Sequence, residues 1–200
     1  MGVNGEPGKG PIPGVVLAAG ASRRLGQPKQ LLPYRGGTLL SHAVERVHGA
    51  FDPVVVVIGA EAERMRAALA AGPAVEIVEN TDWQEGMASS IRAGARHLGA
   101  TAPEAVLLTL VDQPLVTKAH LLEMRETFFT SRPEVVAAVY GGIVGVPAIF
   151  AASMLERLAA LRGVRGARSV VGGPSVRLVR FLLDEADFDI DTPEDAARLG

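Results

Sequence analysis

Leu17-Ala18-Ala19-Gly20-Ala21-Ser22-Arg23-Arg24-Leu25-Gly26-Gln27-Pro28-Lys29-Gln30-Leu31-Leu32 continues an apolar run that begins at Val15. A short apolar run of this kind is typical of a strand buried on both faces of a parallel sheet. In open α/β sheets, ligands bind at the carboxyl ends of the strands, which is where this segment lies. Its small residues let backbone amides approach an anion, and its arginines and lysine add positive charge. The segment therefore predicts a loop that binds a triphosphate.

Neither of the two common phosphate-binding motifs accounts for this loop. A Walker A motif needs GxxxxGK followed by Ser or Thr, and the dinucleotide-binding motif needs GxGxxG; both are absent from the segment. The alternative interpretation is a plain turn between a strand and a helix, with solvated basic residues. The length and order of the segment favour the binding interpretation.

The rest of the chain alternates apolar runs with helical patterns. Strands are expected at 15–19, 54–58 and 105–111, with weaker candidates at 75–78 and 135–139. Helices are expected at 38–48, 61–71, 87–98, 117–129 and 151–161, with Thr117 as an N-cap, and Thr192-Pro193-Glu194-Asp195 is a further helix start. This alternation predicts an α/β fold around a mostly parallel sheet. Residues 140–150 and 176–182 suggest extra strands, antiparallel at one edge.

The composition of the chain excludes several classes of site and predicts a globular protein. The chain has 200 residues, of which 48% are hydrophobic and 21% charged, and its net charge is −2. We expect a flexible tail at residues 1–12 and one domain at 13–200. Bulk charge gives no support for nucleic-acid binding, and no segment has the length of a membrane span. Cysteine is absent, which excludes thiolate metal sites and cysteine nucleophiles, and the expected compartment is the cytoplasm.

The first loop resembles the signature LAAG-x-S-x-RMG-x-x-KQLL of small nucleotidyltransferases. It is most similar to the molybdenum cofactor cytidylyltransferase group and its guanylyltransferase relatives (the MobA/MocA type), with Leu25 in place of methionine. The resemblance implies a Rossmann-like three-layer α/β/α sandwich of the nucleotide-diphospho-sugar transferase type. It also implies nucleotide contacts along the loop, with Arg24 and Lys29 as catalytic cations. The nucleotide-binding set is Leu17, Ala18, Ala19, Gly20, Ser22, Arg23, Arg24 and Lys29, in which Arg23 ranks lower because its family position varies.

A second motif, Gly86-Met87-Ala88-Ser89-Ser90-Ile91, resembles the family segment near the base and ribose. Amides and hydroxyls at a helix start suit polar recognition of a ligand, so Gly86, Ser89 and Ser90 join the nucleotide-binding set. The alternative is simple helix capping by Ser89 or Ser90. Trp83 stands just before this motif and either packs against a neighbouring segment or flanks the base.

Two acidic motifs predict a magnesium site. Asp112 comes at the end of the 105–111 strand and before Gln113-Pro114, where a carboxylate can bind Mg²⁺ against phosphate oxygens. The family carries a similar Asp-Gln-Pro whose aspartate binds metal, which implies a catalytic role for Asp112. Asp189-Ile190-Asp191-Thr192-Pro193 resembles a second family motif, and strand alternation would put Asp189 and Asp191 on one face. Asp191 is preferred as the second metal ligand; capping of the last helix is its alternative role.

The acceptor site departs from the family pattern. Many relatives have Gly-His-Pro where this chain has Gly145-Val146-Pro147, and Val146 can neither carry charge nor form a side-chain hydrogen bond. Gly163-Val164-Arg165-Gly166-Ala167-Arg168 likewise has Val164 in place of an acid. Weak acceptor candidates are Gln113, Pro147 and Arg168, of which Arg168 would meet a phosphate or remain a solvated helix residue.

The resemblance implies that CMP passes from CTP to molybdopterin with release of pyrophosphate. The product would be received by a molybdenum hydroxylase. GTP remains an alternative nucleotide, and a sugar or alcohol phosphate remains an alternative acceptor. A non-catalytic nucleotide- or cofactor-binding chaperone is the rival of another class. His42, His48, His97 and His120 lack metal-ligand spacing, and we expect structural or surface roles for them.

Overall fold

The computed structural model describes residues 11–163, 166–173 and 175–199. Its strands are β1 (Gly14–Leu17), β2 (Pro33–Tyr34), β3 (Gly37–Thr38), β4 (Val54–Ile58), β5 (Glu76–Glu79), β6 (Ala105–Leu110), β7 (Val135–Tyr140), β8 (Ile143–Ala151) and β9 (Leu178–Leu182). Its α-helices are α1 (Leu39–Val47), α2 (Ala62–Leu69), α3 (Met87–Gly99), α4 (Lys118–Ser131), α5 (Leu155–Ala159), α6 (Arg168–Val171) and α7 (Pro193–Ala197). Short 3₁₀ turns are η1 (Lys29–Leu31), η2 (Trp83–Glu85), η3 (Ala152–Met154) and η4 (Asp184–Asp187).

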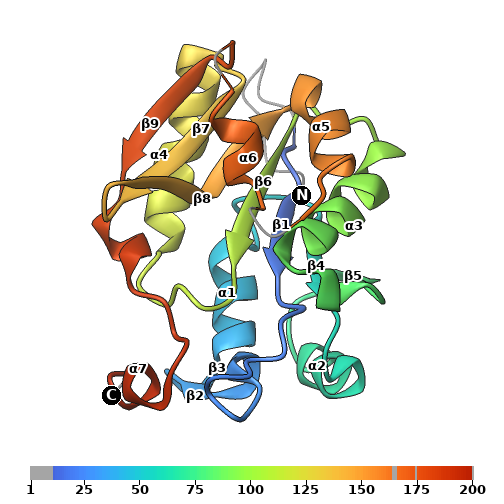
Figure 1. The fold of residues 1–200 in the computed structure, drawn as a ribbon, viewed down its shortest axis with the longest axis vertical. Coiled ribbons are helices and arrows are strands. Elements are labelled where there is room, and N and C mark those ends of the chain that lie inside the picture. Colours follow the sequence, from blue (N-terminus) through green and yellow to red (C-terminus); the bar gives the residue numbers. More distant parts are fainter. Residues whose placement is uncertain (1–10, 164–165, 174, 200) are drawn as a thin grey trace, which may run out of the picture.

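Within the described residues, the main sheet has seven strands in the order β5-β4-β1-β6-β8-β7-β9. The first four run parallel to one another, and β9 runs parallel to β7. Only β8 is reversed, pairing antiparallel with both β6 and β7. Figure 1 shows β1 and β6 near the middle of this sheet, with helices on both sides. The mostly parallel sheet confirms the predicted fold class.

Three details of the predicted elements were wrong. The antiparallel strand lies inside the sheet, between β6 and β7, and the edge strand β9 is parallel. The helix expected at 151–161 is replaced by the end of β8, the turn η3 and the short helix α5. Residues 189–191 form no strand, so the alternation argument for Asp189 and Asp191 does not apply.

Two apolar cores hold the sheet between its helical layers. On one face, Val16 and Val56 pack in a cluster with residues of α1, α2 and α4. On the other face, Val15 and Val57 pack in a cluster with residues of α3, α5 and α6. Successive residues of a strand point to opposite faces, so the continuous apolar runs supply both cores at once. This is the three-layer α/β/α sandwich.

Helix starts follow the local sequence signals. Thr117 and Thr192 accept hydrogen bonds from the backbone of His120 and Asp195, which makes both of them N-caps as predicted. Thr38 does the same for α1. No described helix is both long enough and apolar enough to span a bilayer.

The boundary of the predicted tail needs one correction. Residues 1–10 lie outside the described residues, but Ile12 is buried and its carbonyl accepts a hydrogen bond from Asp52 N. Ile12 therefore belongs to the packed part of the chain. The parallel strands β1, β4 and β6 all end at the same edge of the sheet, and the candidate site lies at that edge.

Candidate active site

The first loop is closed by hydrogen bonds to its own backbone. The buried side chain of Gln30 donates from Nε2 to the carbonyls of Ala18 and Gly20, at 2.7 and 2.8 Å. Ser22 adopts a left-handed backbone conformation (φ 51°), and its Oγ accepts a hydrogen bond of 3.0 Å from Lys29 N. The loop is thereby folded back on itself, and Gln30 is a structural residue that the prediction overlooked.

Gly20 lies at the open side of the loop. It is exposed, and a Cβ added there would meet no heavy atom of the protein within 4 Å. Leu17, Ala18 and Ala19 are buried, and their carbonyls accept hydrogen bonds from Val111 N, Gln30 Nε2 and Ala60 N. Arg23 and Arg24 are both exposed at the loop surface.

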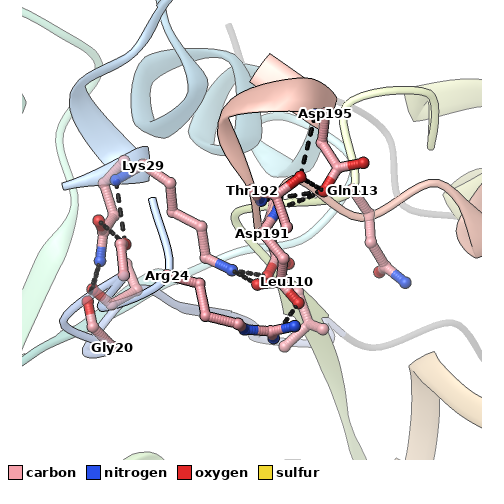
Figure 2. Close-up of polar contacts among 12 residues, drawn as sticks. Gly20, Arg24, Lys29, Leu110, Gln113, Asp191, Thr192 and Asp195 are labelled. Atoms are coloured by element: carbon pink, nitrogen blue, oxygen red, sulfur yellow. Dashed lines mark hydrogen bonds and ion pairs between the residues drawn. The ribbon is translucent and has the colours of Figure 1, made fainter. Parts of the chain in front are cut away.

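Three parts of the chain meet at Lys29. Its Nζ donates to Asp112 Oδ2 at 2.5 Å and to Asp191 Oδ1 at 2.8 Å. Arg24 donates to the other oxygen of Asp191 at 2.6 Å, and Figure 2 shows Arg24 and Lys29 reaching it from the loop side. Because Ile190 N donates to the carbonyl of Asp112 at 3.0 Å, the two acidic segments are also joined through their backbones. The predicted loop and both predicted acids thus form one cluster.

Within this cluster the pKa of Lys29 is raised and the pKa of Asp191 is lowered. Burial by itself lowers the pKa of Lys29, but the carboxylates of Asp112 and Asp191 outweigh it and raise that pKa above 10.5. Burial raises the pKa of Asp191, yet Lys29 and Arg24 outweigh it and hold this pKa below 3.8. Lys29 and Asp191 are therefore both charged near neutral pH.

Asp189 behaves differently from Asp191. Burial, together with the nearby charges of Asp112 and Asp191, raises its pKa to about 7, although Lys29 opposes this rise. Its Oδ1 is buried without a hydrogen-bond partner. Of the two candidate acids in this motif, only Asp191 pairs with the loop cations.

The donor set fits a hard divalent cation. Asp112 and Asp191 offer carboxylate oxygens, and Oδ1 of Asp112 is buried without a hydrogen-bond partner. Among the described residues, no group of three or more acids or histidines is placed to hold a metal by itself. Mg²⁺ is commonly held by one or two carboxylates together with substrate phosphates, so two acids suit a cation that arrives with a triphosphate.

The start of α3 lies near the first loop, but its serines face inward. A Cβ on Gly59 would come within 2.9 Å of Ala19 and 2.7 Å of Trp83, so this glycine permits close contact between the segments. Asn80 Nδ2 donates to the hydroxyls of Ser89 and Ser90, at 2.8 and 3.0 Å, and both serines are buried. At this helix start, Gly86 is partly exposed and the side chain of Met87 is exposed. Asn80 is a second residue that the prediction overlooked.

A cavity of about 640 Å³ lies beside the cluster. Its walls are mainly small or apolar, and its ionisable acid and base are Asp189 and Arg168. The lining residues are Met87, Leu110, Tyr140, Gly145, Val146, Ala167, Arg168, Ser169 and Asp189. Val146 lies in this wall, at the position where the Gly-His-Pro motif of many relatives has histidine. Of the three acceptor candidates, only Arg168 lines this cavity.

Gln113 and Pro147 are placed in the interior. Gln113 is fully buried, and its Nε2 donates to the carbonyls of Val146 and Ala186, at 3.2 and 2.8 Å. Pro147 is buried within β8 and does not line the cavity. Gln113 thus links the Asp112 turn to β8 and to η4. Val164 and Arg165 lie outside the described residues.

Both the sequence and the structure are similar to those of known proteins. The profile of the family described as "MobA-like NTP transferase domain" matches residues 14–180. Over 105 residues the chain is 47% identical to the nicotine blue oxidoreductase of Paenarthrobacter nicotinovorans, a match that spans 52% of this chain and half of that relative. Over 181 residues it is 25% identical to the molybdenum cofactor cytidylyltransferase of Escherichia coli K12, covering 90% and 91% of the two chains.

The structure is similar to that of Rv0371c from Mycobacterium tuberculosis H37Rv. The two have a TM-score of 0.79 and 33% sequence identity, over 95% of this chain and 98% of the other. A structure of the same M. tuberculosis protein in complex with manganese has a TM-score of 0.75 and 31% identity, over the same shares of the two chains. The sequence thus matches the MobA-like family model over residues 14–180, and the fold matches that of the M. tuberculosis protein over nearly the whole chain.

Proposed function

This chain belongs to the MobA-like NTP transferase family and is a nucleotidyltransferase, and we propose that it transfers CMP from CTP to a phosphorylated small molecule, with molybdopterin as the favoured acceptor. Pyrophosphate is the second product. The observation that carries the proposal is the contact of Lys29 with both Asp112 and Asp191 at the mouth of the glycine loop. This contact supports the proposal because Lys29 and the two acids that we assign to the metal belong to one hydrogen-bonded cluster.

The reaction needs positioning and charge neutralisation more than proton transfer. An oxygen of the acceptor phosphate attacks the α-phosphorus of CTP and forms the new phosphorus–oxygen bond. The bond from that phosphorus to the bridging oxygen breaks, and its electron pair leaves with pyrophosphate. Because a phosphate nucleophile is already anionic near neutral pH, no general base is required.

In this proposal the loop residues hold the triphosphate. The backbone around Gly20 and Ser22 supplies amides, while Arg24 and Arg23 reach the phosphates from the loop surface. Lys29 lies deepest and compensates charge at the reacting phosphate. Asp112 and Asp191 hold Mg²⁺, which supplies further charge neutralisation when bound. The manganese complex of the M. tuberculosis relative supports a divalent cation in this family.

The nucleotide base is assigned to the start of α3. Gly86 offers backbone groups there, and Ser89 and Ser90 hold Asn80, whose position shapes this wall. CTP is favoured over GTP because the loop has the Ala-Ala-Gly form, whereas guanylyl relatives tend toward Ala-Gly-Gly. The cytidylyltransferase name of the E. coli relative supports the same choice.

The acceptor is assigned to the 640 Å³ cavity beside the cluster. Arg168 is placed to meet an anionic group, and the apolar walls suit a ring body. We propose that the product is received by a molybdenum hydroxylase. A sugar or alcohol phosphate is the second candidate acceptor, favoured by Val146, because a valine in the wall lacks the hydrogen bond that many relatives would offer through histidine.

A pyrophosphate-release assay tests the proposal directly. The purified chain is assayed with each of the four ribonucleoside triphosphates, with molybdopterin or a panel of sugar and alcohol phosphates, with and without Mg²⁺. Release only with CTP, molybdopterin and Mg²⁺ together is the expected result. Thermal shifts with each nucleotide are recorded in parallel, since a ligand that binds the native state raises its apparent stability.

Other outcomes separate the alternatives. Turnover with GTP would change the assigned nucleotide, and turnover with a sugar phosphate would change the assigned acceptor. Either result would leave the reaction class intact. Strong triphosphate binding without turnover on any acceptor would favour a non-catalytic chaperone. The absence of any triphosphate binding would refute the proposal.

A further inference from the structure

Arg46 is a buried cation beneath the candidate active site. It lies on α1, where it is 4% exposed, among the buried apolar residues of that helix. Burial lowers its pKa to about 10, against the opposing effect of Asp112, so the guanidinium remains charged near neutral pH. A buried charge is costly unless its hydrogen bonds are satisfied, which makes its partners informative.

The partners of Arg46 surround one residue of the site. Its two terminal nitrogens donate to the carbonyls of Leu110 and Gln113, to Val116 O at 3.3 Å and to Thr109 Oγ1 at 3.2 Å. The three carbonyls belong to residues 110–116, the turn that carries Asp112 between β6 and α4. All of these acceptors are uncharged oxygens. The guanidinium therefore holds the turn through several uncharged acceptors and not through one carboxylate.

Arg46 and Lys29 contact different parts of the segment that carries Asp112. Lys29 contacts Oδ2 of Asp112 from the loop, whereas Arg46 grips the backbone on both sides of this residue. The planar fork of a guanidinium can bridge several acceptors in a fixed geometry, which a lysine cannot do. The turn is therefore fixed by a rigid group that does not reach the solvent.

We propose that Arg46 is a positioning residue that sets the orientation of Asp112 for metal binding without touching the substrate. The proposal rests on the proposed nucleotidyltransferase function and adds to it a residue outside the recognised motifs. Outer partners that orient metal ligands commonly change metal affinity or activity by about 10–100-fold when they are removed. We expect losses of this size for the metal, with a smaller change in the KM for the nucleotide.

The test compares Arg46→Met with Leu40→Ala. Leu40 is fully buried on the same helix and makes no hydrogen bond to the turn through its side chain, so its truncation lowers Tm without releasing the turn. Three measurements are made on the full chain: Mn²⁺ affinity by electron paramagnetic resonance, in the presence of the preferred triphosphate; kcat and KM; and hydrogen exchange of the backbone amides within residues 110–116, of which Pro114 has none. Arg46→Lys is added as the variant that keeps the charge but loses the fork.

In Arg46→Met, we expect Mn²⁺ affinity to fall by about 10-fold or more and kcat by about 100-fold, with faster exchange at residues 110–116. Arg46→Lys should lose less Mn²⁺ affinity and less kcat than Arg46→Met does. Leu40→Ala should keep the Mn²⁺ affinity of the unchanged protein. Unchanged Mn²⁺ affinity and kcat in a folded Arg46→Met would overturn the proposal. Should Arg46→Met not fold, the same result in Arg46→Lys would overturn it.

The exchange measurement separates this inference from the proposed function. If the unchanged protein shows neither Mn²⁺ binding nor turnover, the function fails, and the claim that Arg46 orients a metal ligand fails with it. If the unchanged protein is active and the Arg46 variants exchange residues 110–116 no faster than Leu40→Ala does, only the present inference fails.

Discussion

Lys29 and Asp191 lie 162 residues apart in the chain, yet Lys29 Nζ donates a 2.8 Å hydrogen bond to Asp191 Oδ1. The same ammonium contacts Asp112, so it lies between the two carboxylates that we assign to the metal. Without a ligand the lysine compensates the charge of both acids. Binding of a divalent cation to them would therefore have to compete with Lys29.

Replacing Lys29 with Met should separate metal binding from catalysis. Turnover should fall by about 100-fold or more, because the cation at the reacting phosphate is lost. Mn²⁺ binding in the absence of nucleotide should become tighter than in the unchanged protein, because the competing ammonium is gone. Mn²⁺ titration followed by electron paramagnetic resonance measures this change.

Lys118→Met is the matched control for this experiment. The ammonium of Lys118 contacts a carbonyl, that of His48, and lies outside the cluster. Its removal should change neither Mn²⁺ binding nor turnover. Weaker metal binding in Lys29→Met than in the unchanged protein would contradict the competition.

Gly20→Ala should weaken triphosphate binding without affecting folding. The added methyl group meets no protein atom within 4 Å, and Gly20 does not adopt a positive φ, so Tm should stay within about 1 °C in the absence of ligand. The methyl group would instead occupy space at the loop that we assign to the phosphates. Thermal shift with CTP and Mg²⁺ measures the loss. An undiminished CTP shift would place the phosphates elsewhere.

Gln30→Leu should destabilise the loop from within. The substitution leaves the carbonyls of Ala18 and Gly20 without their donor, and an unsatisfied buried group costs about 1–3 kcal/mol. We expect that loss in the free energy of unfolding, measured with urea, together with a higher KM for the triphosphate. A variant with unchanged stability would show that water or another donor replaces the Gln30 amide.

Arg168→Met should raise the KM for the phosphorylated acceptor and leave the KM for the triphosphate unchanged. The reason is that Arg168 lines the cavity assigned to the acceptor and makes no described contact with the Lys29 cluster. A charge-assisted contact to phosphate supports a change of about 10-fold or more. Arg64→Met, an exposed arginine of α2, is the control. Equal effects of Arg168→Met on both KM values would argue against a separate acceptor site.

Acid should remove the stabilisation that Asp191 contributes. The folded-state pKa of Asp191 lies below its ordinary 3.8, so its contribution is present above pH 3.8 and is lost as pH falls through the folded-state value. The stability difference between the protein and Asp191→Asn should therefore shrink on acidification below pH 3.8. Urea unfolding across this range measures it, with the exposed Asp184→Asn as the comparison. A difference independent of pH would mean that the ion pair with Lys29 is not formed in solution.

Much of the site was predictable because its residues lie in motifs next to strand ends. Parallel strands bring their carboxyl ends to one edge, so a loop after β1 and an acid after β6 must be neighbours. The burial of Ser89 and Ser90 was not predictable, because it depends on Asn80, which hydrogen-bonds them from another part of the chain. Arg46 gave only a faint signal, an arginine on the apolar side of a helix.

The amino-acid sequence by itself determined the local elements of this protein: the apolar runs that form strands, the threonine caps, and the composition of the glycine loop. These depend on interactions between near neighbours in the chain, which a pattern records. The tertiary structure alone decided that β8 lies reversed between β6 and β7, that Arg24 and Lys29 both pair with Asp191, and that Arg46 supports the Asp112 turn. Those outcomes depend on contacts between segments tens of residues apart, whose partners no local pattern specifies.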